Sequence, residues 1–146
     1  MALFRVVRTT SLPPAETWRR LTEWPAHAAH VPLTRVAVLT PGPPGTGTRF
    51  VARTGLGRWT FDDTMEIVRW QPPAPELSGR CRLEKRGRTV MGWAEIEVLT
   101  TPEGSRVVWE EELRLRGVPR ALDPAVAGTA RRLFGRVVDG LLTARQ

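Results

Sequence analysis

The order of its predicted elements constrains this chain more than any single motif does. One strand comes first, two short helical segments follow, then a long run of strands, and a long helix closes the chain. Strands joined by short turns form an antiparallel sheet, and an amphipathic helix buries its apolar face against such a sheet. The order therefore predicts an α+β fold in which a curved sheet grips the last helix, and such folds commonly enclose a pocket for a small molecule.

Length and composition place the chain among ordinary globular proteins. Its 146 residues suit one domain, 1–146, with 41% hydrophobic and 25% charged residues. No apolar run approaches the ~20 residues that span a bilayer, and the first residues lack the features of a signal peptide. The single cysteine, Cys81, excludes an internal disulfide framework. We expect a cytoplasmic protein without a membrane span.

The net charge of +7 comes almost entirely from arginine, because Lys85 is the only lysine among the 22 basic residues. Arginine in place of lysine, with abundant alanine, glycine and proline, is typical of a GC-rich bacterial genome. The arginines are scattered in runs no longer than two, whereas nucleic-acid binders cluster their basic residues on one helix or face. We therefore do not expect nucleic acid as the partner.

Turn signals divide the chain into its elements. We expect strands over 2–10, 34–40, 48–54, 58–70, 79–86, 89–100 and 105–116. Helical segments are expected over 14–21, with Ser11 as a candidate cap, and from Trp24-Pro25 to about Pro32. Asp123-Pro124 has the form of a helix start, with aspartate as N-cap and proline in the first position.

The last helix presents one broad apolar face. Its members recur at helical spacing: Val126, Ala130, Leu133, Phe134, Val137, Val138, Leu141 and Leu142. Gly128 and Gly135 lie seven residues apart, and each costs about 1 kcal/mol relative to alanine. Four explanations stay open for these glycines, which are codon drift without a structural role, close packing on the sheet, room beside a pocket, or a bend in the helix.

Strand alternation predicts which side chains face the helix. The expected inward sets are Val107, Trp109, Glu111, Leu113 and Leu115; Trp59, Phe61, Asp63, Met65 and Ile67; Cys81, Leu83 and Lys85; and Val90, Gly92, Ala94, Ile96 and Val98. Gly92 and Ala94 are small where a filled core would need bulk, which indicates space under the helix. Trp59 and Trp109 are candidates for stacking on an aromatic ligand, and packing in the core is the preferred interpretation.

Three charged residues, Asp63, Lys85 and Glu111, fall on this otherwise apolar inner surface. Buried charges are costly unless they are paired, so these residues either pair with one another or touch water or ligand at the cavity mouth. A β-bulge would shift the alternation by one residue and turn a charge outward. They are also the candidate catalytic residues, with no confident assignment among them.

Other chemistry-bearing residues give weaker signals. His27 and His30 are three residues apart, a spacing that can place two metal ligands on one helix face, but no further ligand follows at a suitable distance. We expect no metal and no cofactor, and we place the two histidines near the pocket entrance. Cys81 is expected to be buried and inert.

The order and spacing of several segments resemble the START/Bet v 1-like (SRPBCC, helix-grip) superfamily, in particular bacterial polyketide cyclase/dehydrase-like proteins. The segments are Pro14-Ala15-Glu16-Thr17-Trp18, Trp24, Gly47-Thr48-Arg49-Phe50, Gly104-Ser105-Arg106-Val107-Val108-Trp109 and the helix after Asp123-Pro124. The resemblance implies a seven-stranded sheet and a hydrophobic cavity that binds lipids, hormones, polyketides or other apolar molecules. It transfers no catalytic residue, because the family has no universal catalytic motif.

Three functions follow, in order of preference. The first is binding of a small hydrophobic molecule, the second a polyketide cyclase or dehydratase that uses an inward carboxylate as general base, and the third a basic interaction module. The expected ligand-binding residues are Trp59, Phe61, Asp63, Met65, Lys85, Gly92, Ala94, Trp109, Glu111, Phe134 and Val138. Ligand identity and oligomeric state stay open.

Overall fold

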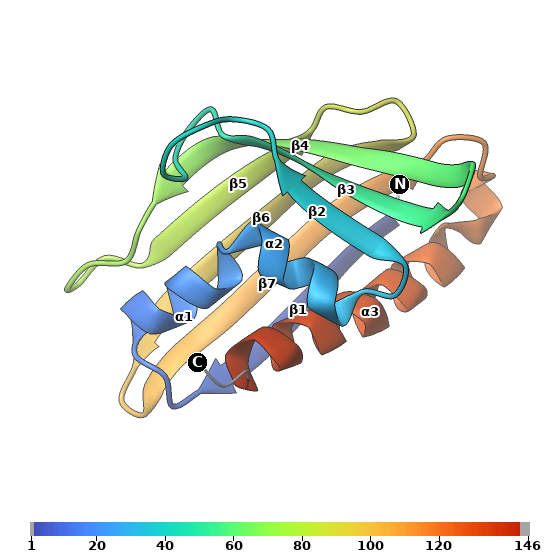
Figure 1. The fold of residues 1–146 in the computed structure, drawn as a ribbon. Coiled ribbons are helices and arrows are strands. Elements are labelled where there is room, and N and C mark those ends of the chain that lie inside the picture. Colours follow the sequence, from blue (N-terminus) through green and yellow to red (C-terminus); the bar gives the residue numbers. More distant parts are fainter. Residues whose placement is uncertain (1, 144–146) are drawn as a thin grey trace.

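The computed structural model describes residues 2–143, and their elements follow the predicted order (Figure 1). The helices are α1 (Pro14–Leu21), α2 (Trp24–His27) and α3 (Asp123–Thr143), and the 3-10 turns are η1 (Ala28–His30) and η2 (Arg120–Leu122). The strands are β1 (Ala2–Thr10), β2 (Thr34–Val38), β3 (Arg49–Leu56), β4 (Trp59–Gln71), β5 (Gly79–Lys85), β6 (Val90–Thr101) and β7 (Gly104–Leu115).

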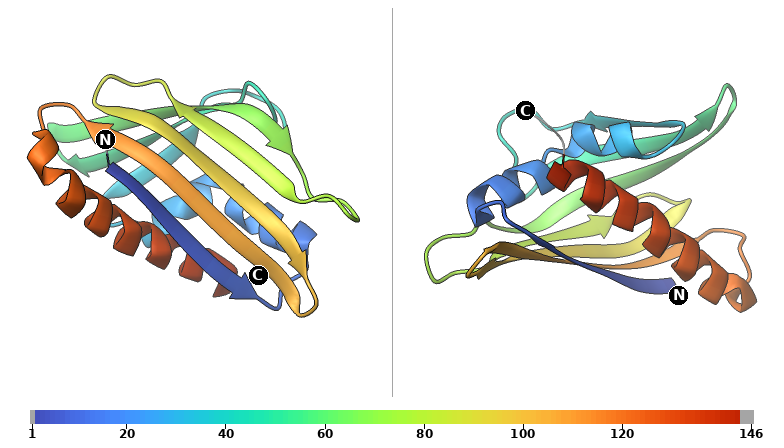
Figure 2. Two further views of the ribbon diagram at one scale, coloured as in Figure 1. Left: turned by 180° about the vertical axis from the view of Figure 1, so that it is seen from behind. Right: turned by 90° about the horizontal axis from the view of Figure 1, so that it is seen from below.

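All seven strands form one antiparallel sheet in the order β1-β7-β6-β5-β4-β3-β2. The sheet curves around α3, while α1 and α2 lie on the same side of it as α3 (Figures 1 and 2). This arrangement confirms the predicted helix-grip architecture with two short helices after the first strand. None of the helices within residues 2–143 combines the length and apolar character needed to cross a membrane.

The predicted strand phases are confirmed where they matter for the cavity. In β7 the side chains of Val107, Trp109, Glu111 and Leu113 are buried, in strict alternation. The register of β4 against β5 shifts between Ile67 and Arg69. Because this irregularity comes after Asp63 in the strand, Asp63 keeps the inward direction that simple alternation predicts.

Two predicted helix caps are wrong. The N-cap of α1 is Pro13, which makes no side-chain cap hydrogen bond, and Ser11 lies two residues too early to reach the first turn. Asp123 has helical dihedral angles, φ −53° and ψ −42°, because η2 leads directly into α3. Asp123 is therefore the first helical residue, where its negative charge still suits the N-terminal end of the helix dipole.

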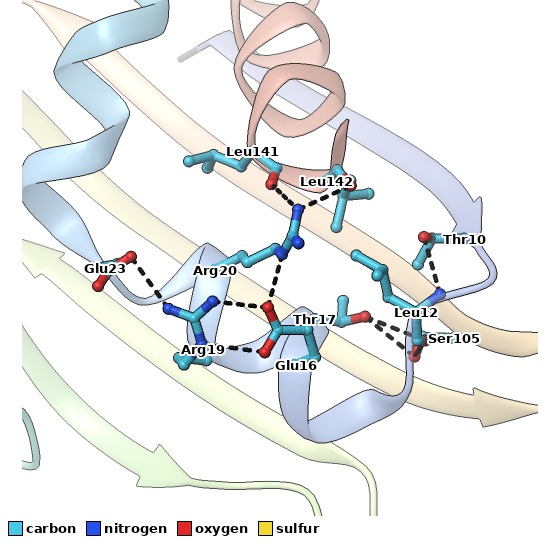
Figure 3. A network of polar contacts seen from close by, with 10 residues as sticks. All are labelled: Thr10, Leu12, Glu16, Thr17, Arg19, Arg20, Glu23, Ser105, Leu141 and Leu142. Atoms are coloured by element: carbon cyan, nitrogen blue, oxygen red, sulfur yellow. Dashed lines mark hydrogen bonds and ion pairs between the residues drawn. The ribbon is translucent and has the colours of Figure 1, made fainter. Parts of the chain in front are cut away.

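A polar network attaches α1 to the C-terminal end of α3 (Figure 3). Arg20 donates from Nε to Glu16 Oε1 at 2.9 Å and from Nη1 to the carbonyl oxygens of Leu141 and Leu142, both at 3.2 Å. Positive charge near the last carbonyls of a helix is favourable. We refer to Glu16, Arg19, Arg20 and these two carbonyl groups as the end network.

Candidate functional site

A cavity of about 570 Å³ lies between the sheet and the first turns of α3. Most of its walls are aliphatic or aromatic, and five successive members of the predicted apolar face of α3 contribute: Val126, Ala130, Leu133, Phe134 and Val137. The lining residues that are also exposed are Phe61, Leu122, Ala125 and Thr129. The cavity therefore opens between the beginning of β4 and the beginning of α3.

Aromatic rings form one wall of this cavity. Trp109 on β7 packs against Phe134 on α3 with ring centroids 5.3 Å apart, and Trp24 stacks on Phe50 at 4.6 Å. His27 links the two pairs, with its ring 5.7 Å from that of Trp109 and 5.5 Å from that of Trp24. Such a wall offers large apolar area with few rotatable bonds, which suits a rigid or planar ligand.

The three predicted inward charges meet at one place in the cavity, and we call them the cavity cluster. Lys85 Nζ donates to Asp63 Oδ2 at 2.7 Å and lies 3.6 Å from Glu111 Oε2. Trp109 Nε1 donates to the other Glu111 oxygen, Oε1, at 3.3 Å. Strand pairing brings the three residues together. Met65, two residues after Asp63 on β4, pairs with Lys85 on β5. Ala94 on β6 pairs on one side with Leu83, two residues before Lys85, and on the other with Glu111.

Burial governs the ionisation of this cluster. It raises the pKa of Glu111 and of Asp63 above their ordinary values, although the Lys85 ammonium beside them acts in the opposite direction. Burial alone would lower the pKa of Lys85, but attraction by Glu111 and Asp63 outweighs it and the pKa is raised. A raised carboxyl pKa brings a group closer to the range in which it can accept and release a proton near neutral pH.

The remaining predicted reactive groups have structural neighbours. His27 Nε2 lies 2.8 Å from the carbonyl oxygen of Leu21, and burial lowers the pKa of this imidazole to about 4. His30 packs against Gly140 of α3, so the two imidazoles face different partners. Within residues 2–143 no group of three or more side chains is arranged to hold a metal ion. Cys81 is buried as predicted, and burial raises the pKa of its thiol to about 12.

Comparison with known families decides the relationship that the sequence suggests. Residues 1–144 match the family described as "Polyketide cyclase / dehydrase and lipid transport". The chain belongs to this family. A comparison with the curated proteins found no match.

Solved structures related to this family member share its fold at low sequence identity. The protein TTHA0849 from Thermus thermophilus is 18% identical with a TM-score of 0.74, over 95% of this chain and 93% of that chain. CV1439 from Chromobacterium violaceum is 13% identical with a TM-score of 0.67, covering 97% and 96%. Ara h 8.0201 is 13% identical with a TM-score of 0.64, covering 97% and 98%. Identities this low establish the Bet v 1-like fold and nothing about the ligand.

In this family member most of the residues expected to bind ligand do line the cavity. They are Phe61, Asp63, Met65, Lys85, Trp109, Glu111 and Phe134. Trp59 does not, because it begins β4 directly after the β3–β4 turn and is 80% exposed. Val138 is fully buried in the core beyond the cavity.

Gly92 and Ala94 also lie outside the lining, and the reason for their small size differs from the one predicted. Gly92 has φ +130°, and a Cβ there would collide with the carbonyl oxygen of Glu112, so the backbone itself requires glycine. Ala94 is buried on β6 between Leu83 and Glu111.

The two helix glycines that drew attention in the sequence do not shape the cavity. A Cβ on Gly128 would meet open space, and one on Gly135 would meet the guanidinium of Arg8. Gly140 is the close-packed glycine of α3, because the His30 ring occupies the space beside it.

Several lining residues were not among the predicted site residues, although their spacing carried a signal. Trp24 and His27 are three residues apart in α2, so they share a face, and that face closes the cavity opposite α3. Phe50, Ala52 and Thr54 alternate along β3 and line the cavity together. The alternation rule applied to the longer strands would have found this set as well.

Proposed function

We propose that this protein binds a small hydrophobic molecule, of lipid, polyketide or aromatic type, in the cavity between the sheet and α3. The observation that carries the proposal is the cavity itself, because about 570 Å³ of space with mainly apolar walls stays open in a fold that otherwise packs a well-filled core. Ligand pockets generally enclose roughly 300–1,000 Å³ and are lined in this way.

The surface around the mouth of the cavity supports entry of an apolar ligand, either from solution or from an apolar phase. Leu56, Trp59 and Phe61 are exposed on the β3–β4 hairpin, and the exposed Leu33 accepts a hydrogen bond from Gly55 of the same hairpin; Leu122, just before α3, is also exposed. Phe61 and Leu122 belong to the lining as well, so apolar surface continues from the outside into the cavity. Such a carrier would act in the cytoplasm, the compartment expected from the sequence.

Native mass spectrometry of the purified protein, followed by denaturation and extraction, tests this proposal. We expect an extra mass that is lost on denaturation and that belongs to an apolar compound. A protein without cargo is then titrated with apolar probes, since a ligand at 100 times its dissociation constant stabilises by about 2.7 kcal/mol. Absence of both a bound mass and any thermal shift would contradict the proposal.

A cavity-filling variant sharpens the test. Ala52 on β3 lines the cavity, whereas its neighbour Val51 points to the other face of the same strand. We expect Ala52→Phe to abolish the bound mass and Val51→Phe to retain it. Equal binding by both variants would place the ligand elsewhere.

A second candidate is a polyketide cyclase or dehydratase, favoured by one observation, the buried carboxylates beside an ammonium group in the cavity. Glu111 or Asp63 would take a proton from the carbon next to a substrate carbonyl. The electron pair of that C–H bond would move towards the carbonyl oxygen, and the Lys85 ammonium would stabilise the resulting enolate.

Carboxamide variants separate this candidate from simple binding. We expect Glu111→Gln or Asp63→Asn to reduce turnover at least ~100-fold if the group is the general base. Glu112→Gln is the matched control, because Glu112 points to the opposite face and accepts a hydrogen bond from Trp93. Full activity in both cavity variants would reject the enzymatic assignment.

A basic interaction module remains the third candidate function. On the outer face of the sheet several arginines pair with carboxylates on neighbouring strands: Arg49 with Glu66, Arg53 with Asp62, Arg80 with Glu97, and Arg82 with Glu95. These pairs neutralise part of the basic charge that a nucleic acid would need, which supports the preference for a small-molecule ligand.

A further inference from the structure

The charges that line the cavity do not balance. Among its described lining residues the ionisable side chains are Asp63, Lys85 and Glu111, together with His27, whose buried imidazole has its pKa lowered to about 4. With Asp63, Lys85 and Glu111 all ionised the cavity would carry one uncompensated negative charge, and burial, which raises the pKa of both carboxyl groups, opposes this state unless a second cation enters. Buried charge is costly unless an opposite charge and hydrogen bonds compensate it.

Two oxygens of this cluster are buried and accept no hydrogen bond from any described residue. They are Asp63 Oδ1 and Glu111 Oε2. Glu111 is only 2% exposed, and its other oxygen already accepts from Trp109. Lys85 directs its one short hydrogen bond at Asp63 Oδ2 and lies 3.6 Å from Glu111 Oε2, and both acidic residues line the cavity. Buried acceptors in proteins normally have a donor, so such a pair points to a group that is supplied from outside the chain.

We infer that the cavity binds an apolar molecule with a positively charged amine, and that the amine lies against Asp63 Oδ1 and Glu111 Oε2. This inference rests on the proposed function and names the class of its ligand. An ammonium group supplies the missing positive charge and donates to both oxygens, and hydrogen bonds between ionised groups are about twice as strong as neutral ones. The aromatic and aliphatic walls take the remainder of the molecule.

The same geometry discriminates against acids. A carboxylate head group would add a third negative charge to a cluster that holds one ammonium, and it has no proton to give to the orphaned oxygens. A neutral alcohol can donate one hydrogen bond without correcting the charge. Affinity should therefore fall from amine to alcohol to carboxylate when the apolar tail is held constant.

Decylamine, decanol and decanoic acid form the matched series that tests this order. Each is titrated into the cargo-free protein near neutral pH, below its aggregation limit, and binding is followed by calorimetry. We expect decylamine to bind about tenfold more tightly than decanol, the difference between a charged and a neutral hydrogen bond. Decanoic acid should bind more weakly than decanol.

Variants connect the preference to the cluster. In Glu111→Gln the charge balances without ligand, so the preference for decylamine over decanol should fall close to one while decanol still binds. Glu112→Gln, on the other face of β7, should keep the preference of the unchanged protein. A preference that survives Glu111→Gln would overturn the inference.

The outcomes separate this inference from the proposed function. If decanol binds as well as decylamine, the amine preference is wrong and binding of an apolar molecule stands. If decanoic acid binds most tightly, the sign of the recognised charge is wrong. If none of the three binds and Ala52→Phe changes nothing, both the inference and the proposed function fail.

Discussion

The end network and the cavity cluster are both built from carboxylates and cations, yet their carboxylates have opposite surroundings. In the end network the Glu16 carboxylate pairs with two guanidinium groups, of Arg19 and Arg20, and Arg19 also lies 3.5 Å from Glu23. In the cavity cluster one ammonium group is divided between two carboxylates. The first cluster joins two helices through protein partners alone, whereas the second leaves two buried oxygens without donors among the described residues.

Because their surroundings differ, the pKa values of the two carboxyl groups are shifted in opposite directions. Hydrogen bonds from Arg19 and Arg20 lower the pKa of Glu16 to about 2, while burial raises the pKa of Glu111. A carboxylate that accepts hydrogen bonds from two guanidinium groups in contact with water keeps its charge. A shortage of cations in an apolar cavity leaves a charge that another molecule can balance. The comparison teaches that the end network serves the fold and that the cavity cluster is suited to recognition.

Removing the only cation of the cavity cluster should have the largest effect. Lys85→Met leaves two buried carboxylates uncompensated, and we expect the free energy of unfolding to fall by about 3–5 kcal/mol near pH 8. Near pH 5 the loss should be smaller, because the carboxylates can then take up protons. Urea denaturation at both pH values measures the loss in the free energy of unfolding, and the exposed Arg88→Met variant is the control. An equal loss at both pH values would contradict the electrostatic account.

Breaking the end network should cost less and leave binding intact. Arg20→Met removes hydrogen bonds to Glu16 and to two carbonyl groups at the end of α3, and we expect a loss of about 2 kcal/mol. Decylamine affinity, corrected for the folded fraction, should stay within about twofold of the unchanged protein. Arg132→Met, an exposed position on α3, is the control. A large selective loss of affinity would show that the two clusters are coupled.

Glycines near the two ends of α3 offer a comparison that does not involve charge. A Cβ at Gly140 meets the His30 ring, so Gly140→Ala should destabilise by about 1–3 kcal/mol. A Cβ at Gly128 meets open space, and Gly128→Ala should stabilise by up to about 1 kcal/mol. Thermal unfolding distinguishes the two. Similar effects would mean that α3 is packed equally tightly along its length.

The smallest effects should be two pH profiles of opposite sign. The pKa of Glu16 is lowered, so its stabilisation is present above about pH 4.5 and is lost as the pH falls towards 2. The pKa of Glu111 is raised, so the folded state favours its protonated form, and that contribution is lost as the pH rises above about 4.5 through the higher folded pKa.

Near pH 7 we therefore expect Glu16→Gln to be less stable than the unchanged protein and Glu111→Gln to be at least as stable. For Glu111→Gln the difference should vanish near pH 4, whereas for Glu16→Gln it should only diminish there. Denaturant midpoints at the two pH values measure both. Two profiles with the same sign would remove the distinction between the clusters.

Much of the site was predictable because strand alternation has a period of two. Glu111 faces inward since Trp109 and Leu113 do, and Asp63 and Lys85 follow from the same rule. Alternation says which face a side chain takes and not how far the opposite element extends over that face. Trp59 has the phase of Phe61 and is nevertheless exposed, at the turn between β3 and β4.

The reason for each small residue was equally invisible in the sequence. In the sequence Gly92 suggests space in the core. Its positive φ angle and the nearby Glu112 carbonyl explain why glycine is required there without any cavity. Gly128 and Gly140 look alike in the sequence of α3, and only the position of His30 distinguishes them. Steric contacts between residues far apart in the chain decide such cases.

The sequence by itself determined the order of the elements, the antiparallel sheet, the apolar face of the last helix and the inward direction of three charges, since all of these follow from local periodicity. Only the tertiary structure decided that the three charges meet, that one ammonium serves two carboxylates, and that two of their oxygens find no donor within residues 2–143. Periodicity acts along one strand, whereas the balance of charge in a cavity depends on distances between strands.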